Sequence, residues 1–169
     1  MPQDDAGSGD GAFAWLFRRE YPAIVRTVAL ILDDREAAKE VVQEAFVRLL
    51  LHWGRVSRYD RPGAWVRRVA IRLAVRSARL RLRRSSAERS AWAPGATAGP
   101  ADLDLRRAVV GLPRRQRVAV TLFYLEDRPV DEVADLLGCS PSTVRVHLHR
   151  ARRRLATALR QEDDDDARV

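Results

Sequence analysis

The fold of the second half of the chain follows from residues 130–155, VDEVADLLGCSPSTVRVHLHRARRRL. A short apolar-periodic segment comes first, a turn containing Gly138 follows, and Ser140 before Pro141 is a typical start for another helix. This order predicts a helix-turn-helix. In its second helix one apolar face should be buried, made of Val144, Leu148, Ala151 and Leu155.

The two helices of this motif differ in charge. Residues 141–160 contain six arginines and no acid, whereas residues 130–137 contain three acids. A basic helix of this kind suits the negatively charged major groove of DNA, although an ordinary helical hairpin with a solvated arginine face is the alternative. The candidate DNA-contacting residues of the basic helix are Ser142, Thr143, Arg145, Val146, His149, Arg150 and Arg153.

The flanking sequence is also helical in pattern. Apolar residues recur at spacings of three and four from Phe13 to Ile31, from Ala38 to Leu50 and from Trp65 to Leu80. Asp33 and Asp34 suit a cap between the first two of these segments. No segment alternates strictly between apolar and polar residues, as a half-buried strand would. We therefore expect an all-α protein.

Composition divides the chain into two small helical domains joined by a flexible linker. The expected linker, 85–102, is rich in Ala, Ser, Gly and Pro and has no apolar stripe. The domains are expected at 12–84 and 103–160, with a disordered N-terminus at 1–11 and an acidic tail at 161–169.

The overall composition excludes several classes of protein. The 169 residues carry a net charge of +8, and of the 31 basic residues only Lys39 is lysine. The single cysteine cannot form an intrachain disulfide, and no apolar run approaches the roughly 20 residues that a membrane span needs. The acidic, Gly-rich start is unlike a signal peptide. We expect a soluble, cytoplasmic protein with a polyanionic partner.

A second basic segment, 65–84, contains eight arginines and no acid. Such a run of like charge favours a polyanion, and nearby aromatic rings can stack on unpaired bases. The candidate residues of this second nucleic-acid site are Arg58, Tyr59, Trp65, Arg67, Arg68, Arg72 and Arg76. Core packing of Trp65, an exposed loop position for Tyr59 and a solvated helix face for the arginines are the alternatives.

The helix expected near residues 34–51 has an acidic polar face. Glu40, Gln43 and Glu44 lie on it, between two segments that suit DNA. Acids do not favour DNA, so this face fits a protein partner, with a solvated helix face as the alternative.

Three ordered stretches resemble the extracytoplasmic-function (ECF) group of RNA polymerase sigma factors, the minimal two-domain form of the sigma-70 family. REAAKEVVQEAFVRLL resembles region 2.2, RPGAWVRRVAIRLAVRSAR resembles regions 2.3–2.4, and LPRRQRVAVTLFYLED with the helix-turn-helix resembles region 4. The resemblance covers about residues 12–160. Arg72 and Arg76 stand where many members carry Asn and Asp, which favours phosphate binding at these positions.

The resemblance implies partners for each surface. Glu40, Gln43 and Glu44 would bind the β′ clamp helices of core RNA polymerase, and the second domain would lie on the β flap and read the −35 element of promoter DNA. The loop at 55–61 and the basic helix would hold the −10 element. An anti-sigma factor is a possible further partner.

Other functions explain less of the sequence. A stand-alone helix-turn-helix regulator of duplex DNA accounts for residues 130–155 but not for the acidic helix or the arginines of 65–84. A membrane-surface or RNA-binding helical protein is a third interpretation. An enzyme is disfavoured because no nucleophile–base pair or Gly-rich phosphate loop is present. We expect no cofactor, no metal and no small-molecule substrate.

Overall fold

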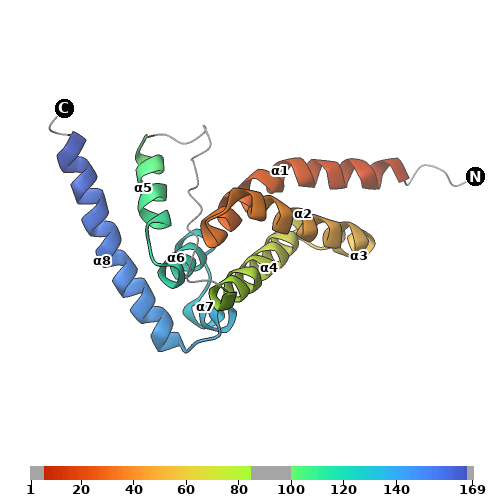
Figure 1. Cartoon of the computed structure of the whole chain (residues 1–169). Coiled ribbons are helices and arrows are strands. Elements are labelled where there is room, and N and C mark those ends of the chain that lie inside the picture. The colour runs from red at the N-terminus through yellow and green to blue at the C-terminus, as the bar shows by residue number, and fades with distance from the viewer. Residues whose placement is uncertain (1–5, 85–99, 167–169) are drawn as a thin grey trace, which may run out of the picture. The chain divides into compact units, whose positions relative to one another are not determined.

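The computed structural model describes the backbone of residues 6–84 and 100–166 and the side chains of residues 11–80 and 105–160. Within these ranges every regular element is helical and no strand is present, so the all-α prediction is confirmed (Figure 1). The chain divides into two compact units, Met1–Arg84 and Ser85–Val169. Most of the expected linker, residues 85–99, lies outside the described residues.

The first unit contains helices α1 (Ala6–Leu32), α2 (Arg35–Leu51), α3 (Trp53–Val56) and α4 (Pro62–Arg84). Helices α1, α2 and α4 pack on one another and supply the core. Its almost completely buried side chains include Ile24, Val28, Ile31, Val42, Leu49, Val66 and Ile71. The three helices therefore form a small bundle that leaves the remaining face of α4 in solvent.

Two aspartates make the turn between α1 and α2. Asp33 follows α1 with left-handed backbone, φ 59°, which aspartate tolerates better than most residues. Asp34 is extended, and its carboxylate accepts a hydrogen bond from the amide of Ala37 at 3.0 Å. The capping role predicted for this pair is therefore confirmed for Asp34.

Aromatic rings join the start of α1 to α2 and α3. Phe13 meets Phe46 with ring centroids 6.4 Å apart and Trp53 with centroids 5.3 Å apart, both edge to face. The sequence predicts a loop at 55–61, but the one-turn helix α3 extends into the beginning of this stretch. Complete burial of Val56 fixes that turn against the bundle.

The second unit contains α5 (Pro100–Val110), α6 (Arg114–Val120), the π-helical turn η1 (Thr121–Leu125), α7 (Val130–Leu137) and α8 (Pro141–Asp166). Arg117 of α6 is buried, and its guanidinium donates a hydrogen bond to the carbonyl of Val110 at 2.6 Å, which ties α5 to α6. Helix α8 packs against α5, α6 and α7.

The helix-turn-helix is confirmed in α7 and α8. Gly138 follows α7 in the left-handed region at φ 63°, ψ 46°, where glycine has no Cβ to clash. Ser140 starts α8, since its Oγ accepts a hydrogen bond from the amide of Thr143 at 3.2 Å. Both local signals in the sequence therefore act as predicted.

Helix ends differ from the expected domain limits. Helix α1 begins at Ala6, inside the stretch 1–11 for which we expected disorder, and α5 begins at Pro100, inside the expected linker. Helix α8 continues to Asp166, so much of the expected tail 161–169 is helical. A helix that has already formed extends at low cost, and no Gly or Pro follows Leu159 to end α8. Residues 1–5 and 167–169 lie outside the described residues.

Candidate nucleic-acid interfaces

Helix α8 presents one buried face and one exposed face. Val144, Leu148 and Ala151 are buried, as the apolar spacing predicted, while Leu155 is half-buried. The exposed side contains Ser142, Arg145, Val146, His149, Arg150 and Arg153. Val146 is a large apolar residue with 45% of its surface exposed. An exposed apolar side chain between arginines suits a surface that contacts another molecule.

Thr143 differs from the other candidates on this helix. It is half-buried, and its Oγ1 lies 2.8 Å from the Oγ of Ser140. Ser142 Oγ also lies 2.8 Å from that Ser140 hydroxyl. The start of α8 is therefore a small hydroxyl cluster that fixes the first turn, and Thr143 contributes mainly to this cap.

His147 is a half-buried residue at the edge of the exposed face. Neither of its ring nitrogens has a hydrogen-bond partner among the described residues. Burial is the main cause that lowers the pKa of His147 below its ordinary value, and the positive charges of Arg115 and Arg150 lower it further. The imidazole is consequently neutral at pH 7. His147 therefore adds no positive charge to this part of α8 at that pH.

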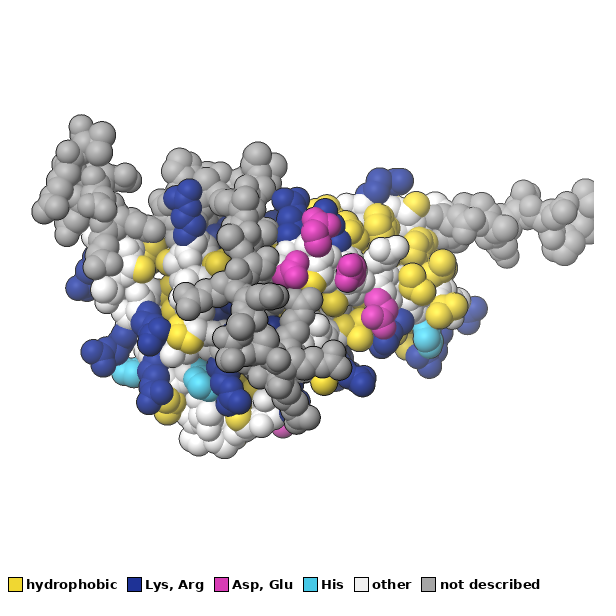
Figure 2. Space-filling model, in the orientation of Figure 1, with side chains coloured by type: hydrophobic (Ala, Val, Ile, Leu, Met, Phe, Trp, Pro, Cys, Tyr) yellow, Lys and Arg dark blue, Asp and Glu magenta, His cyan; other side chains and the backbone are white. Residues whose placement is uncertain are grey.

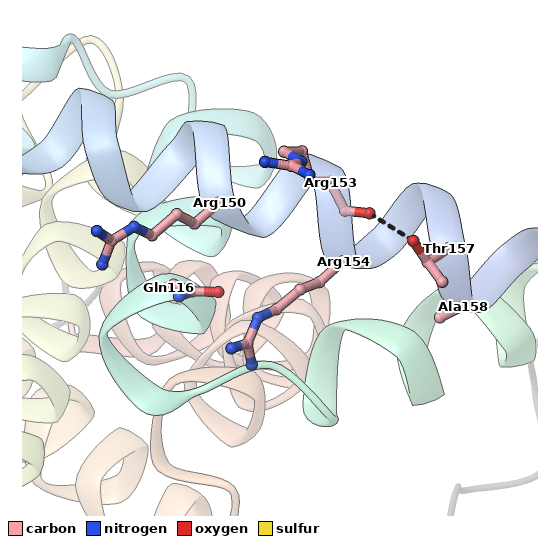
Figure 3. A pocket seen from close by; sticks show the side chains of 6 residues that line it. All are labelled: Gln116, Arg150, Arg153, Arg154, Thr157 and Ala158. Carbon is pink, nitrogen blue, oxygen red and sulfur yellow. Dashed lines mark hydrogen bonds between the residues drawn. The ribbon is translucent and has the colours of Figure 1, made fainter.

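An open cavity of about 590 Å³ lies on one flank of α8, between this helix and α6. Its lining consists of Gln116, Arg150, Arg153, Arg154, Thr157 and Ala158 (Figure 3). Thr157 donates a hydrogen bond to the carbonyl of Arg153 at 3.1 Å, and Gln116 is buried beneath the arginines. Sequence reasoning missed this cavity, because Gln116 comes from another helix and no local pattern connects it with α8.

Helix α4 exposes a row of arginines along one side. Arg68, Arg72, Arg76 and Arg79 are all exposed at helical spacing, and none forms an ion pair with a described residue. We call these four residues the α4 arginine row. Such unneutralised charge attracts a polyanion.

Two of the predicted nucleic-acid-binding residues on α4 are less exposed to solvent than expected. Arg67 is half-buried, and its guanidinium donates to the hydroxyl of Thr27 on α1 at 3.4 Å. Trp65 is half-buried too, with its ring centroid 5.9 Å from that of His52. Both side chains therefore contribute to packing between helices. Arg58 and Tyr59, in contrast, lie exposed before the start of α4.

Helix α2 exposes a face with two kinds of side chain. Glu40, Gln43 and Glu44 are exposed, and Glu44 pairs with Arg48 one turn later. Figure 2 shows Asp and Glu side chains gathered over the region of α1 and α2. The C-terminal half of the same face is apolar, since Val47, Leu50 and Leu51 are 51%, 55% and 77% exposed. Sequence reasoning placed Leu50 in the core, and the structure shows that it is exposed.

The described residues lack the features of a metal site and of a membrane span. Over those ranges no three His, Cys, Asp or Glu side chains gather closely enough to hold a metal ion. None of the described helices combines the length and apolar composition that crossing a membrane requires.

Two parts of the chain match family descriptions. Residues 16–85 match Sigma-70 region 2, and residues 102–155 match Sigma-70, region 4. The first match covers most of α1 and all of α2, α3 and α4. The second match covers most of α5, all of α6, η1 and α7, and the N-terminal half of α8.

Two relatives and one solved structure place these matches in context. The chain is 31% identical over 157 residues to the ECF RNA polymerase sigma factor SigM of Mycobacterium tuberculosis, covering 88% of this chain and 77% of SigM. It is 32% identical over 161 residues to the probable RNA polymerase sigma factor RfaY of Xanthomonas campestris, covering 85% of this chain but only 40% of that relative. The sigma factor RpoE, solved in complex with the anti-sigma factor NepR from Bartonella quintana, has a similar fold, with a TM-score of 0.62, 20% identity and coverage of 88% of this chain and 97% of RpoE.

Proposed function

The chain belongs to the ECF group of the sigma-70 family, and we propose that it binds core RNA polymerase and directs it to promoters with −35 and −10 elements. It thereby initiates DNA-templated transcription. This proposal rests on the presence of both sigma regions, in the order of the family, on the two helical units. Sigma factors regulate RNA polymerase and are not themselves catalysts of the reaction.

Each exposed surface has a proposed role. We assign the −35 element to the exposed side of α8, namely Ser142, Arg145, Val146, His149, Arg150 and Arg153, with Thr143 holding the first turn. This assignment rests on their exposure and on the lack of ion pairs between these arginines and described acids. Arginine recognises guanine by paired hydrogen bonds, and an apolar side chain such as Val146 can contact a thymine methyl.

The −10 element is assigned to the first unit. The α4 arginine row would hold phosphates, and the exposed Tyr59 beside Arg58 would stack on an unpaired base. Arg67 and Trp65 would support the shape of α4 from its packed side, since both contact neighbouring side chains.

Core polymerase is assigned to α2 and to the second unit. Glu40, Gln43 and Glu44 would meet the β′ clamp helices, and the second unit would meet the β flap. Helix α2 exposes the negative charge of Glu40 and the apolar side chain of Leu50 on one face. This combination supports a protein partner rather than DNA. An anti-sigma factor remains a possible partner. Because bacterial RNA polymerase is cytoplasmic, we propose that the chain acts in the cytoplasm.

The stand-alone regulator is the second candidate, and one experiment separates the two. Electrophoretic mobility shift with genomic promoter fragments should show weak specific binding by the free chain and strong binding by the chain with core polymerase. The physical reason is that two separate DNA-binding units bind together only when a partner fixes their spacing. Equally tight specific binding by the free chain would favour the stand-alone regulator.

A further inference from the structure

The cavity between α8 and α6 combines groups that suit one chemical class of ligand. Two arginines one helical turn apart, Arg150 and Arg154, extend on the side of Gln116 (Figure 3). Arg153 also lines the cavity. No described carboxylate lies within ion-pair distance of any of these three guanidinium groups. The cavity therefore holds a concentration of positive charge that no described acid offsets.

Gln116 gives this cavity a polar floor. Its side chain is only 7% exposed, and its Oε1 has no hydrogen-bond partner among the described residues. A buried amide without its full set of hydrogen bonds is uncommon in folded proteins, because each missing bond costs free energy. The unpartnered Oε1 is an acceptor, so its missing bond would come from a guanidinium N–H of Arg150 or Arg154. An oxyanion between these two arginines would instead accept from the amide N–H of Gln116.

Helix geometry places this cavity beside the groove-facing side of α8. At about 100° per residue, Arg154 lies about 140° around the helix axis from His149. An α-helix with its side chains is about 10–12 Å wide and the major groove is about 12 Å wide, so the flanks of an inserted helix face the phosphate walls. When His149 faces the bases, Arg150 lies about 100° and Arg154 about 140° around the axis, so both leave the base-facing side. The long side chains of these arginines can extend from there to the sugar–phosphate backbone beside the helix.

We propose that Arg150, Arg154 and Gln116 form a phosphate-binding pocket that holds one backbone phosphate beside the −35 element. This inference rests on the proposed function, and it changes the role of Arg150 from base reading to phosphate binding. Guanidinium groups bind phosphate oxygens through paired, charge-assisted hydrogen bonds. The pocket would thus set the depth and register of α8 in the groove, while Arg145, Val146 and His149 would discriminate between bases.

The test uses the holoenzyme, reconstituted from the full chain and core polymerase, on promoter fragments that the wild-type holoenzyme selects. Two variants address the pocket: Arg154→Gln removes a guanidinium group, and Gln116→Leu removes the polar floor. Arg160→Gln is the matched control, since Arg160 is exposed on the same helix about 15 Å beyond Arg150. Circular dichroism confirms that each variant folds.

We expect Arg154→Gln to weaken binding about tenfold on every −35 sequence alike and to lower the salt slope of log affinity by about one unit. A methylphosphonate at the contacted phosphate should weaken the wild type equally and leave Arg154→Gln with no further loss. Gln116→Leu should give the same pattern with a smaller effect, and Arg160→Gln should behave as wild type.

Three results would overturn the proposal. The first is wild-type affinity and salt slope for Arg154→Gln. The second is a loss that depends on the base pair at one −35 position, which would make the pocket a base reader. The third is binding of free tripolyphosphate that requires Arg154, measured by calorimetry, with no methylphosphonate effect, which would assign the pocket to a soluble phosphate compound. Failure of the proposed function looks different, because the wild-type holoenzyme itself would then show no promoter preference.

Discussion

The α4 arginine row should stabilise the DNA complex and destabilise the free protein at the same time. Arg68, Arg72, Arg76 and Arg79 are exposed and close in sequence along one helix face, with no ion pair to a described acid. Like charges at these spacings repel, and phosphate would relieve the repulsion. We therefore expect exchange of Arg68, Arg72 and Arg76 for Gln to weaken promoter binding and to raise the melting temperature of the free chain.

The size of both effects follows from the spacing. Each like-charge neighbour pair costs about 0.2–0.5 kcal/mol, so removing the repulsion along the row should stabilise the first unit by about 1 kcal/mol. For a unit of this size that corresponds to a Tm increase of about 4–8 °C. Glutamine has nearly the helix propensity of arginine, so backbone preference contributes little. Loss of three phosphate contacts should lower the salt slope of holoenzyme binding by about 2–3 units.

Two measurements check this prediction. Circular dichroism melting of the free chain at low and at high salt should show a Tm increase that shrinks as salt screens the charges. Fluorescence anisotropy of the holoenzyme on labelled promoter DNA over a range of salt gives the slope. The control exchanges Arg18, Arg26 and Arg35, three exposed arginines outside the row, for Gln. An unchanged slope would remove α4 from the DNA interface, and an unchanged Tm at low salt would show that its arginines do not repel one another.

Three further predictions concern other parts of the molecule. Charge reversal by Glu40→Arg and Glu44→Arg should abolish capture of core polymerase in a pull-down while helical content stays the same; retained capture would leave this face of α2 as ordinary solvated surface. Asp34→Ala removes the cap of α2 and should cost about 1 kcal/mol of unfolding free energy in urea titration, whereas Asp34→Asn should cost much less. Because the folded-state pKa of His147 is below its unfolded value, the wild type should lose stability as pH falls from about 6.5. In melting experiments from about pH 7 to 5, His147→Leu should remove the part of this loss that comes from His147. Equal pH profiles of the wild type and the variant would contradict the prediction.

Local signals in the sequence predicted the helix-turn-helix well. Gly138 ends α7 and Ser140 starts α8 through the backbone conformations and hydrogen bonds that these residue types prefer. Helix starts and turns depend on a few adjacent residues, so the sequence contains what is needed. The buried stripe of α8 followed from spacing for the same reason.

Features that depend on distant residues could not be predicted in this way. Arg67 belongs to a run of arginines, yet its guanidinium bonds to Thr27, which lies 40 residues earlier in the chain. The pocket under Arg154 requires Gln116 from another helix. Leu50 has the spacing of a core residue but is 55% exposed, because the packing of α1 and α4 decides which side of α2 is covered.

The division of the core into two units also has a consequence for synthesis on the ribosome. The helices that bury the core of the first unit all lie before Ser85, so that unit is complete once Arg84 has emerged. Translation at about 5–20 residues per second leaves several seconds before the second unit follows, whereas helical bundles fold in microseconds to milliseconds. The arginine-bearing α4 is therefore folded on the nascent chain well before α8 exists. Ribosomal RNA is the polyanion nearest to it during that interval.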